Sequence, residues 1–320
     1  MRSGGAQRVA CLVALALSAA TSVQAQDYPK RPIEIIVPWG QGGGADQVAR
    51  RIAKLLEPRL GVQVTVSNVS GGSGQKGLAK MRAATADGYT LSVMTGDTFG
   101  LLATQRPDWT LEDIAPIAIL IQQPSAFLVH EGSRLKSWKD VEIAAKGENL
   151  RVAVAGLGSP DELTVNYLVR KGLKLVAVSF TKPGERHTAL LNGLADVLYE
   201  QIGDVRSFVE NRQMRPVLLF AETRGDRLKD IPTSHELGYQ IGLPQFRALV
   251  VRSDTDGRAI DRLGRAMAEV ADDPEYAAYL EQQFADPGSF KPASEAAIFM
   301  RAELDRLRVL VAEQNAMLGR

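Results

Sequence analysis

Short apolar runs alternate with longer segments of mixed polarity along the chain, and this alternation predicts strands and helices in turn. In the first part of the chain, β-branched runs at residues 33–37, 62–66 and 90–94 predict three strands. Residues 45–56 carry apolar side chains at helical spacing, and a second helical pattern follows the glycines at 71–74. This order predicts a mostly parallel, doubly wound α/β sheet.

The same order returns in the second half of the chain. Strands are predicted at residues 150–154, 175–178, 197–199 and 217–221. Helices are predicted at residues 160–170 and 183–192, and Gly193 closes the second of them. Two similar α/β units in one chain predict two domains, and a helical tail follows at residues 256–271, from 274 onward, and at 292–318.

The first 25 residues have the pattern of a secretory signal peptide. Arg2 and Arg8 form a basic start, residues 9–20 form an apolar run, and Val23-Gln24-Ala25 places small residues where a signal peptidase cuts. A membrane anchor is the alternative, but an apolar run of about 12 residues is shorter than the ~20 that span a bilayer. We therefore expect cleavage after Ala25 and export to the periplasm.

Composition and charge narrow the function classes. The chain has 38 basic and 37 acidic residues, a formal charge of +1. Because non-specific nucleic-acid binding depends on a basic surface, we expect no nucleic-acid partner. The single cysteine, Cys11, lies in the predicted leader, so the exported chain would have no disulfide and no thiol for catalysis or metal binding.

The first predicted strand-to-helix loop, residues 38–46, is rich in glycine. Glycines let a ligand approach the main chain closely, and the N-terminus of the next helix offers free N–H groups and a partial positive charge that bind anions. Asp46 also fits a helix cap. Residues 40–45 match the dinucleotide fingerprint, but residues 67–68, Ser-Asn, stand where that motif has an acidic residue. We therefore expect an anion site and no dinucleotide.

Two further loops follow predicted strands. Ser159-x-x-Glu162 is a capping-box pattern with Pro160 at the first helical position, which predicts a second helix start suited to an anion. Thr95-Gly96-Asp97 is either an ordinary turn or part of a cleft. Open α/β sheets bind ligands at the carboxyl ends of their strands, so the loops at 38–46 and 156–162 predict a clamp on an anion.

Catalytic motifs are hard to find in this sequence. The histidines, His130, His187 and His235, lack metal-ligand spacing, and Ser73 lies in Gly-Gly-Ser-Gly-Gln, which is not a nucleophile elbow. Glu200 follows a predicted strand and is either a cleft residue or a solvated carboxylate. An exported hydrolase would need a nucleophile and a base, so we expect a binding protein without cofactor or metal.

Six segments carry a family resemblance together. They are Pro38-Trp39-Gly40-Gln41-Gly42-Gly43-Gly44-Ala45-Asp46, Asn68 with Gly71 and Gly74, Asp87-Gly88-Tyr89-Thr90-Leu91, Pro116-Ile117-Ala118, Gly156-x-Gly158-Ser159, and Asp230-Ile231-Pro232-Thr233 with Glu236-Leu237-Gly238-Tyr239. In order and spacing they resemble the motifs of the tripartite tricarboxylate transporter substrate-binding proteins, the Bug family. The resemblance extends from Tyr28 to the C-terminal helices.

The resemblance implies two doubly wound α/β domains of the periplasmic-binding-protein type, joined by crossover strands, with a ligand cleft between them. With the signal peptide at residues 1–25, we expect domain I at residues 26–125 plus 246–320 and domain II at residues 126–245. We expect hinges near residues 122–125 and 243–247. Members of the family capture small carboxylates in the periplasm and pass them to a membrane transporter or a sensor. A ligand carboxylate is then expected at the main chain of Trp39, Gly42, Gly43, Gly158 and Ser159.

We therefore expect a monomeric periplasmic protein that captures a small organic anion for the permease subunits of a tripartite transporter. A module that presents its ligand to a sensor kinase is the alternative. The candidate ligand-binding residues are Trp39, Gly40, Gly42, Gly43, Asp46, Thr95, Gly96, Asp97, Gly158, Ser159, Phe180, Lys182 and Glu200.

Because of several departures from the family pattern, the sequence does not identify the ligand. Gln41 replaces the usual proline, Trp39 replaces a phenylalanine and narrows the pocket, and residues 160–162 replace small residues and a histidine. Glu200 stands where many members have aspartate or a small residue. A carboxylate there repels a second ligand carboxylate and favours an amine or hydroxyls, unless Lys182 neutralises it.

Overall fold

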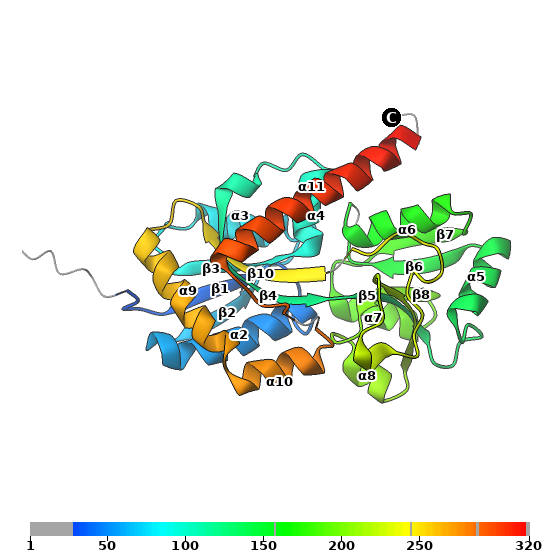
Figure 1. Cartoon of the computed structure of the whole chain (residues 1–320), viewed down its shortest axis with the longest axis horizontal. Helices are drawn as coiled ribbons and strands as arrows, with labels where there is room; N and C mark the ends of the chain where they lie inside the picture. Colours follow the sequence, from blue (N-terminus) through cyan, green and yellow to red (C-terminus); the bar gives the residue numbers. More distant parts are fainter. Residues whose placement is uncertain (1–27, 157, 244, 286–287, 318–320) are drawn as a thin grey trace, which may run out of the picture.

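The computed structural model describes residues 28–317 apart from residues 157, 244 and 286–287. It forms two α/β domains that lie side by side and are joined by crossing strands (Figure 1). The predicted leader and its cleavage site fall outside the described residues.

The first domain is built on a six-stranded sheet in the order β11-β4-β10-β3-β1-β2. Its strands are β1 (Ile33–Val37), β2 (Val64–Asn68), β3 (Thr90–Thr95), β4 (Ile114–Gln123), β10 (Gln245–Arg252) and β11 (Lys291–Pro292). β1 pairs in parallel with β2 and β3, and Ile35 lies opposite Val66 and Leu91. β10 runs antiparallel to both β3 and β4.

The second domain is built on a five-stranded sheet in the order β7-β6-β8-β5-β9. Its strands are β5 (Ser125–His130), β6 (Leu150–Val154), β7 (Leu175–Ser179), β8 (Val197–Gln201) and β9 (Met214–Phe220). β6 pairs in parallel with β7 and β8, whereas β5 runs antiparallel to β8 and β9.

The predicted α/β class with two domains is confirmed, but both sheets are mixed rather than mostly parallel. The strands that follow a helix crossover pair in parallel, as the pattern predicts. The antiparallel members include β4, β5 and β10, which carry the chain between the domains. Only Pro124 separates β4 from β5, so the chain passes from one sheet into the other almost without interruption.

Helices cover both faces of the first sheet, because its strands are apolar on both sides. Along β1, Ile33, Ile35 and Val37 face α2 (Gly44–Leu60) and α9 (Gly257–Ala271), whereas Ile36 faces the opposite side. α10 (Pro274–Gln282) joins the first layer. The other layer consists of α3 (Gln75–Ala83), α4 (Gly96–Thr104) and α11 (Ala293–Met317), with the short 3-10 helix η1 (Leu111–Asp113) nearby.

The second sheet is covered in the same way. α5 (Trp138–Gly147) and α6 (Pro160–Arg170) pack on one face, where Phe127 and Tyr199 lie, and α7 (Pro183–Leu191) and α8 (Arg206–Glu210) pack on the other. The 3-10 helix η2 (Asp226–Leu228) lies in the loop that returns to the first domain. The predicted boundaries of α6 are confirmed, and α7 ends one residue earlier than predicted.

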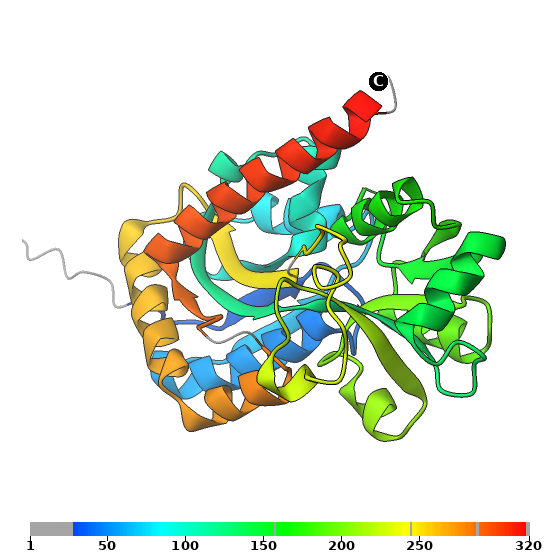
Figure 2. The same ribbon diagram turned by 45° about the vertical axis from the view of Figure 1, so that its right-hand side comes forward.

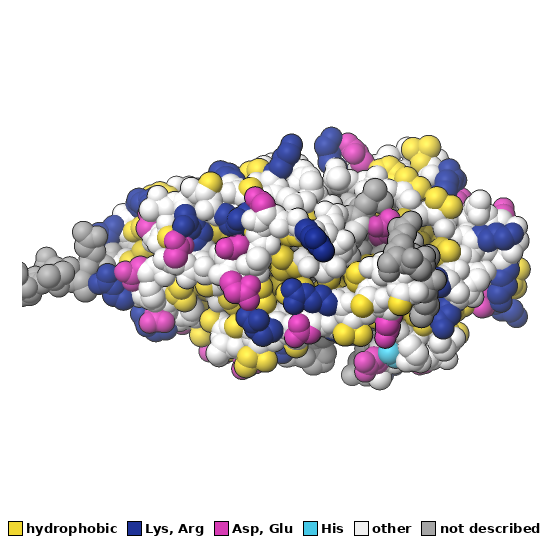
Figure 3. Space-filling model, turned by 90° about the horizontal axis from the view of Figure 1, so that it is seen from above, with side chains coloured by type: hydrophobic (Ala, Val, Ile, Leu, Met, Phe, Trp, Pro, Cys, Tyr) yellow, Lys and Arg dark blue, Asp and Glu magenta, His cyan; other side chains and the backbone are white. Residues whose placement is uncertain are grey.

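α11 connects the two domains. It packs along the first domain and its C-terminal end extends toward α6 (Figures 1 and 2), where Gln314 Nε2 donates a hydrogen bond to the Leu163 carbonyl at 3.1 Å. On the face shown in Figure 3, basic and acidic side chains are interspersed, in keeping with the balanced composition. Within residues 28–317, apart from the gaps, no helix has the length and apolar character to cross a membrane.

Candidate functional site

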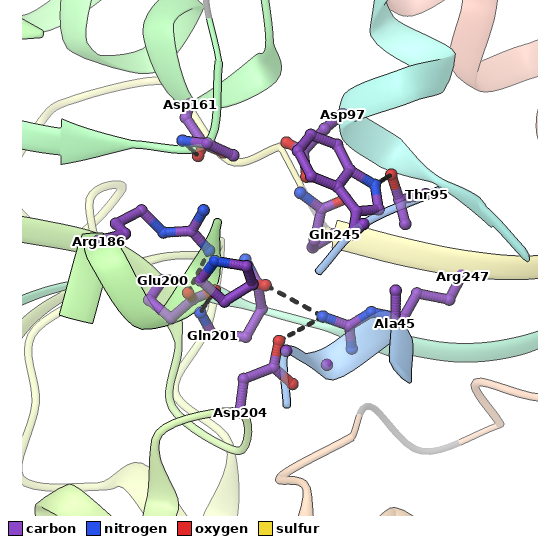
Figure 4. A pocket seen from close by; sticks show the side chains of 15 residues that line it. Ala45, Thr95, Asp97, Asp161, Arg186, Glu200, Gln201, Asp204, Gln245 and Arg247 are labelled. Atoms are coloured by element: carbon purple, nitrogen blue, oxygen red, sulfur yellow. Dashed lines mark hydrogen bonds and ion pairs between the residues drawn. The ribbon is translucent and has the colours of Figure 1, made fainter. Parts of the chain in front are cut away.

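A small cavity lies between the domains, where β1, β3, β6 and β8 end (Figure 4). Its volume is about 30 Å³, which is room for one or two water molecules. The first domain contributes Trp39, Gly43, Gly44, Ala45, Thr95, Asp97, Gln245 and Arg247, and the second contributes Ala155, Asp161, Pro183, Arg186, Glu200, Gln201 and Asp204. The cavity therefore belongs to the interface, at the sheet edge where open α/β folds bind ligands.

The glycine-rich loop presents the N-terminus of α2 to this cavity. Gly42 has φ 81°, a left-handed conformation that favours glycine. Gly44 and Ala45 occupy the first two helical positions and line the cavity. An α-helix has no internal acceptor for the N–H groups at these positions. Both main-chain N–H groups are therefore suited to an anion.

Asp46 stabilises the loop and does not line the cavity. Its carboxylate accepts hydrogen bonds from the Gly42 N–H at 3.0 Å and from Asn68 Nδ2 at 3.0 Å, and it forms an ion pair with Arg50. Burial opposes its charge, but these partners outweigh burial and lower the pKa of Asp46. The side chain thereby fixes the turn that carries the α2 N–H groups.

Thr95, Gly96 and Asp97 begin a helix rather than form an ordinary turn. Thr95 is the N-cap of α4, and its Oγ1 accepts hydrogen bonds from the Thr98 N–H and from Trp39 Nε1 at 3.0 Å. Asp97 lies in the first turn of α4, and its side chain is directed into the cavity (Figure 4).

The start of α6 mirrors this arrangement in the second domain. Ser159 is the N-cap, and its Oγ accepts from the Glu162 N–H, as the capping pattern predicts. The Glu162 carboxylate accepts from the Gly158 N–H at 2.6 Å, one residue before the N-cap. Asp161, in the first turn of α6, lines the cavity, and its Oδ2 accepts from the Ala155 N–H at 2.9 Å.

The Glu200 carboxylate contacts one arginine and one histidine. Its Oε2 accepts a hydrogen bond from Arg186 Nη2 and lies 3.0 Å from His187 Nε2. Burial opposes ionisation, but Arg186 and His187 outweigh it and hold the pKa of Glu200 well below the usual range. Lys182 does not neutralise Glu200, contrary to one alternative drawn from the sequence. Its Nζ is paired instead with Glu185 at 2.8 Å, in an exposed position.

A second buried ion pair crosses from one domain to the other. Asp204, which follows β8, contacts Arg247 on β10 through its Oδ2, and Arg247 also contacts Gln123 and Gln201. A side chain on Gly44 would overlap the Asp204 carboxylate, so that carboxylate lies against the N-terminus of α2. Arg247 and Asp204 thus connect both domains at the cavity.

Unsatisfied polar atoms gather at this cavity. Nine buried side-chain polar atoms have no hydrogen-bond partner among the described residues, and six of them belong to residues that line it. The six are Asp97 Oδ1, Asp161 Oδ1, Asp204 Oδ1, Gln245 Oε1, Arg186 Nε and Arg247 Nε. Folded proteins normally satisfy buried polar groups, so this concentration indicates a functional site.

Burial also raises the pKa of three cavity carboxyls, those of Asp97, Asp161 and Asp204. Removal from water raises the pKa of both Asp97 and Asp161, and the neighbouring Asp97 raises that of Asp161 further. Arg186 acts in the opposite direction on both groups without outweighing burial. No group of three or more His, Cys, Asp or Glu residues in the described part of the chain is arranged to hold a metal ion.

The structure brings five of the predicted ligand-binding residues to the cavity, namely Trp39, Gly43, Thr95, Asp97 and Glu200. The other eight, which do not line it, are Gly40, Gly42, Asp46, Gly96, Gly158, Ser159, Phe180 and Lys182. Most of these shape the loops around it. Gly40 lies close to Pro183 of the second domain, Gly158 has φ 77°, and Phe180 packs on the core beneath α7.

Sequence reasoning missed the charged residues Arg186, Asp204 and Arg247. Arg247 carries the clearest signal, since a cation within the apolar run of residues 246–251 is unexpected in a buried strand. Asp161 departs from the family pattern in the sequence, but that departure alone does not place it in the site. Arg186 and Asp204 have ordinary helix and loop contexts in the sequence, so only the folded arrangement identifies them.

Comparisons with known proteins agree with this architecture. The model of the tripartite tricarboxylate transporter family receptor matches residues 48–316. Protein BugT of Bordetella pertussis is 29% identical over 308 residues, which cover 93% of this chain and 94% of that protein.

Solved structures share the fold. MatC from Rhodopseudomonas palustris with bound malate is 24% identical, with a TM-score of 0.80 over 89% of this chain and 100% of that one. A second R. palustris protein, solved with adipate, is 20% identical, with a TM-score of 0.83 over 90% of this chain and 98% of that one.

Proposed function

The chain belongs to the family of tripartite tricarboxylate transporter receptors, and from that premise we propose that it is a periplasmic protein that closes on one small organic carboxylate and delivers it to membrane permease subunits. Its role is that of a receptor and not of an enzyme. The family and the shared fold are those of solute-binding receptors. The observation that carries the proposal is the interdomain cavity with its concentration of unsatisfied polar atoms.

Both domains contribute donors for a carboxylate to the cavity. Gly44 and Ala45 direct main-chain N–H groups from the start of α2, where the helix dipole also favours negative charge. Arg186 and Arg247 each keep an unpartnered Nε–H among the cavity residues.

Closure is proposed as a hinge motion of two bodies. Residues 26–125 with 246–320 are assigned to domain I and residues 126–245 to domain II, with the boundary residue Gln245 already beginning β10 of the first sheet. The hinges lie near residues 122–125 and 243–247. The space open to water in this cavity is only about 30 Å³, so the domains must move apart to admit a solute and close again around it. The bound malate and adipate of the two structural neighbours support a small carboxylate as the ligand class.

The test is ligand-dependent thermal stability. The purified protein is unfolded and refolded to remove any solute, then heated with a panel of small mono- and dicarboxylates, amino acids and matched amines. A ligand at 100 times its Kd adds about 2.7 kcal/mol to the free energy of unfolding, which raises the Tm by about 5–10 °C in a chain of this size. If no acid or amino acid shifts the Tm, the proposed function is wrong.

A further inference from the structure

The cavity has more negative than positive side chains. Four carboxylates line it, those of Asp97, Asp161, Glu200 and Asp204, but only two arginines do. Glu200 is paired with Arg186, and Asp204 is paired with Arg247. Both arginines are therefore engaged, and Asp97 and Asp161 are left without a cation of their own.

These two carboxyls come from opposite domains and are directed into the same space. Each lies in the first turn of a helix, Asp97 on α4 and Asp161 on α6, and in Figure 4 they lie at the same end of the cavity. Asp97 is 8% exposed and Asp161 is 3% exposed. Each keeps one carboxyl oxygen, Oδ1, without a hydrogen-bond partner, and the Oε1 of neighbouring Gln245 is unpartnered as well.

With both groups ionised, such an arrangement is unfavourable unless a cation, or a proton shared between the two carboxyls, lies there. A buried carboxylate loses its hydration, and a second one beside it adds repulsion. The helix N-termini offset part of this cost. A protonated amine would supply up to three N–H donors and a positive charge to the unpartnered oxygens. A second ligand carboxylate would add a third negative group instead.

We propose that the bound solute carries a protonated amine in addition to its carboxylate, and that the ammonium lies between Asp97 and Asp161. The preferred ligand class is then a small amino acid rather than a plain mono- or dicarboxylate. This inference rests on the proposed function, in which the carboxylate faces Gly44, Ala45 and the arginines. Because the two aspartates belong to different domains, the ammonium also favours the closed arrangement.

The experiment is calorimetric titration of the refolded protein with ligands matched in carbon skeleton. The pairs are acetate with glycine, propionate with alanine, butyrate with 4-aminobutyrate, and succinate with aspartate. Within at least one pair the amine-bearing member is expected to bind at least about tenfold more tightly, a difference of about 1.4 kcal/mol. Equal or tighter binding of the plain acid in every pair that binds overturns the inference and leaves the proposed function intact.

If neither these compounds nor any acid or amino acid of the thermal panel binds, the proposed function itself fails. Titration with CaCl₂ tests whether a metal ion, rather than an ammonium group, binds between the two aspartates. Displacement of the bound amino acid by calcium would show that the aspartates hold a metal ion, and would overturn the assignment of an ammonium.

Matched variants locate the amine site. Asp97→Asn and Asp161→Asn keep the shape of the side chains and remove their charge, so each is expected to reduce the ratio of amino-acid to acid affinity by about tenfold or more. Glu303→Gln is the control, because Glu303 is also buried but lies on α11 away from the cavity. Selectivity that persists in both aspartate variants overturns the assignment, and the wild-type pairs test the ligand class even if a variant fails to fold.

Discussion

At the scale of single residues, Asp46 and Asp97 show opposite uses of a carboxylate in the first turn of a helix. Asp46 is satisfied by Gly42, Asn68 and Arg50, and these partners keep it ionised. Asp97 is equally buried but keeps an unpartnered oxygen at the cavity. The first aspartate stabilises a loop, whereas the second one is available to a ligand.

The raised pKa values of Asp97 and Asp161 predict a pH-dependent loss of stability in the ligand-free protein. A carboxyl whose pKa is higher in the folded state favours folding at acid pH, and this contribution disappears as pH rises through the folded pKa. The variant Asp97→Asn/Asp161→Asn lacks this loss. The double variant should therefore gain stability relative to wild type as pH rises. The difference in free energy of unfolding, variant minus wild type, should be larger at pH 7 than near pH 4.

Chemical denaturation of the two proteins across that pH range measures the difference. The other charged groups at the cavity, Arg186, His187, Glu200, Asp204 and Arg247, are present in both proteins and cancel to first order. Glu200 acts in the opposite sense, because its lowered pKa makes it stabilising above the ordinary glutamate range. A difference that does not change with pH would contradict the account of the aspartate pair.

The sequence predicts only some of the residues that line the cavity, and the reason is physical. Trp39, Gly43 and Thr95 were expected because glycine-rich loops and strand ends are local patterns. Arg186 and Asp204 enter the cavity from a helix interior and a loop, and their partners lie on other strands. Such long-range charge pairing leaves no local signal.

At the scale of elements, the middle and end of α4 contact the start of α6 and so join the two domains. A side chain on Gly100 of α4 would approach Pro160 Cδ at 2.9 Å, and Thr104 Oγ1 donates a hydrogen bond to the Gly158 carbonyl at 2.7 Å. The cap of α6 holds Pro160 and Asp161 at this interface. Ser159 provides that cap, and its Oγ also donates to the Gly156 carbonyl at 2.7 Å.

Ser159→Ala is therefore expected to destabilise the protein. Loss of an N-cap side chain costs about 1 kcal/mol, which lowers the Tm by about 2–4 °C in a domain of this size. Thermal unfolding measures the change. Ser253→Ala, at an exposed position, is the control and should alter stability by less than about 0.5 kcal/mol. An equal Tm for both variants would show that the cap is not used.

The sequence predicted elements best where one pattern was strong. The bounds of β1, β6 and α6 agree with prediction, because β-branched runs and a capped helix start are local features. The antiparallel partners of β10 did not follow from the sequence, since pairing across more than a hundred residues depends on the whole topology. The mixed sheets follow from those pairings.

At the scale of the whole molecule, the closed cavity depends on contacts between the domains. Pro183 of the second domain packs on the glycine loop, Asp204 contacts Arg247, and Gln47 Nε2 donates to the Asp204 carbonyl at 3.3 Å. We propose that this closure traps the ligand. A change that blocks closure without disturbing either domain should therefore abolish binding.

Gly43→Val provides that change. A Cβ at Gly43 would lie 2.5 Å from Pro183 Cγ and 3.2 Å from Pro183 Cβ, whereas the Gly40 carbonyl oxygen is 3.9 Å away. The backbone of Gly43 is in an extended region open to valine. The substitution therefore places a wedge between the domains, at a cost to the α2 cap of about 1 kcal/mol. Gly184→Val is the matched control, because a Cβ at Gly184 meets nothing within 4 Å.

The most direct measurement is calorimetric titration of wild type, Gly43→Val and Gly184→Val with the ligand that gives the largest Tm shift in the panel. The account predicts wild-type affinity for Gly184→Val and a loss of at least about a hundredfold, or ~2.7 kcal/mol, for Gly43→Val with its circular dichroism spectrum unchanged. Wild-type affinity in a folded Gly43→Val protein would show that the solute is not held between the closed domains, and would contradict the central claim.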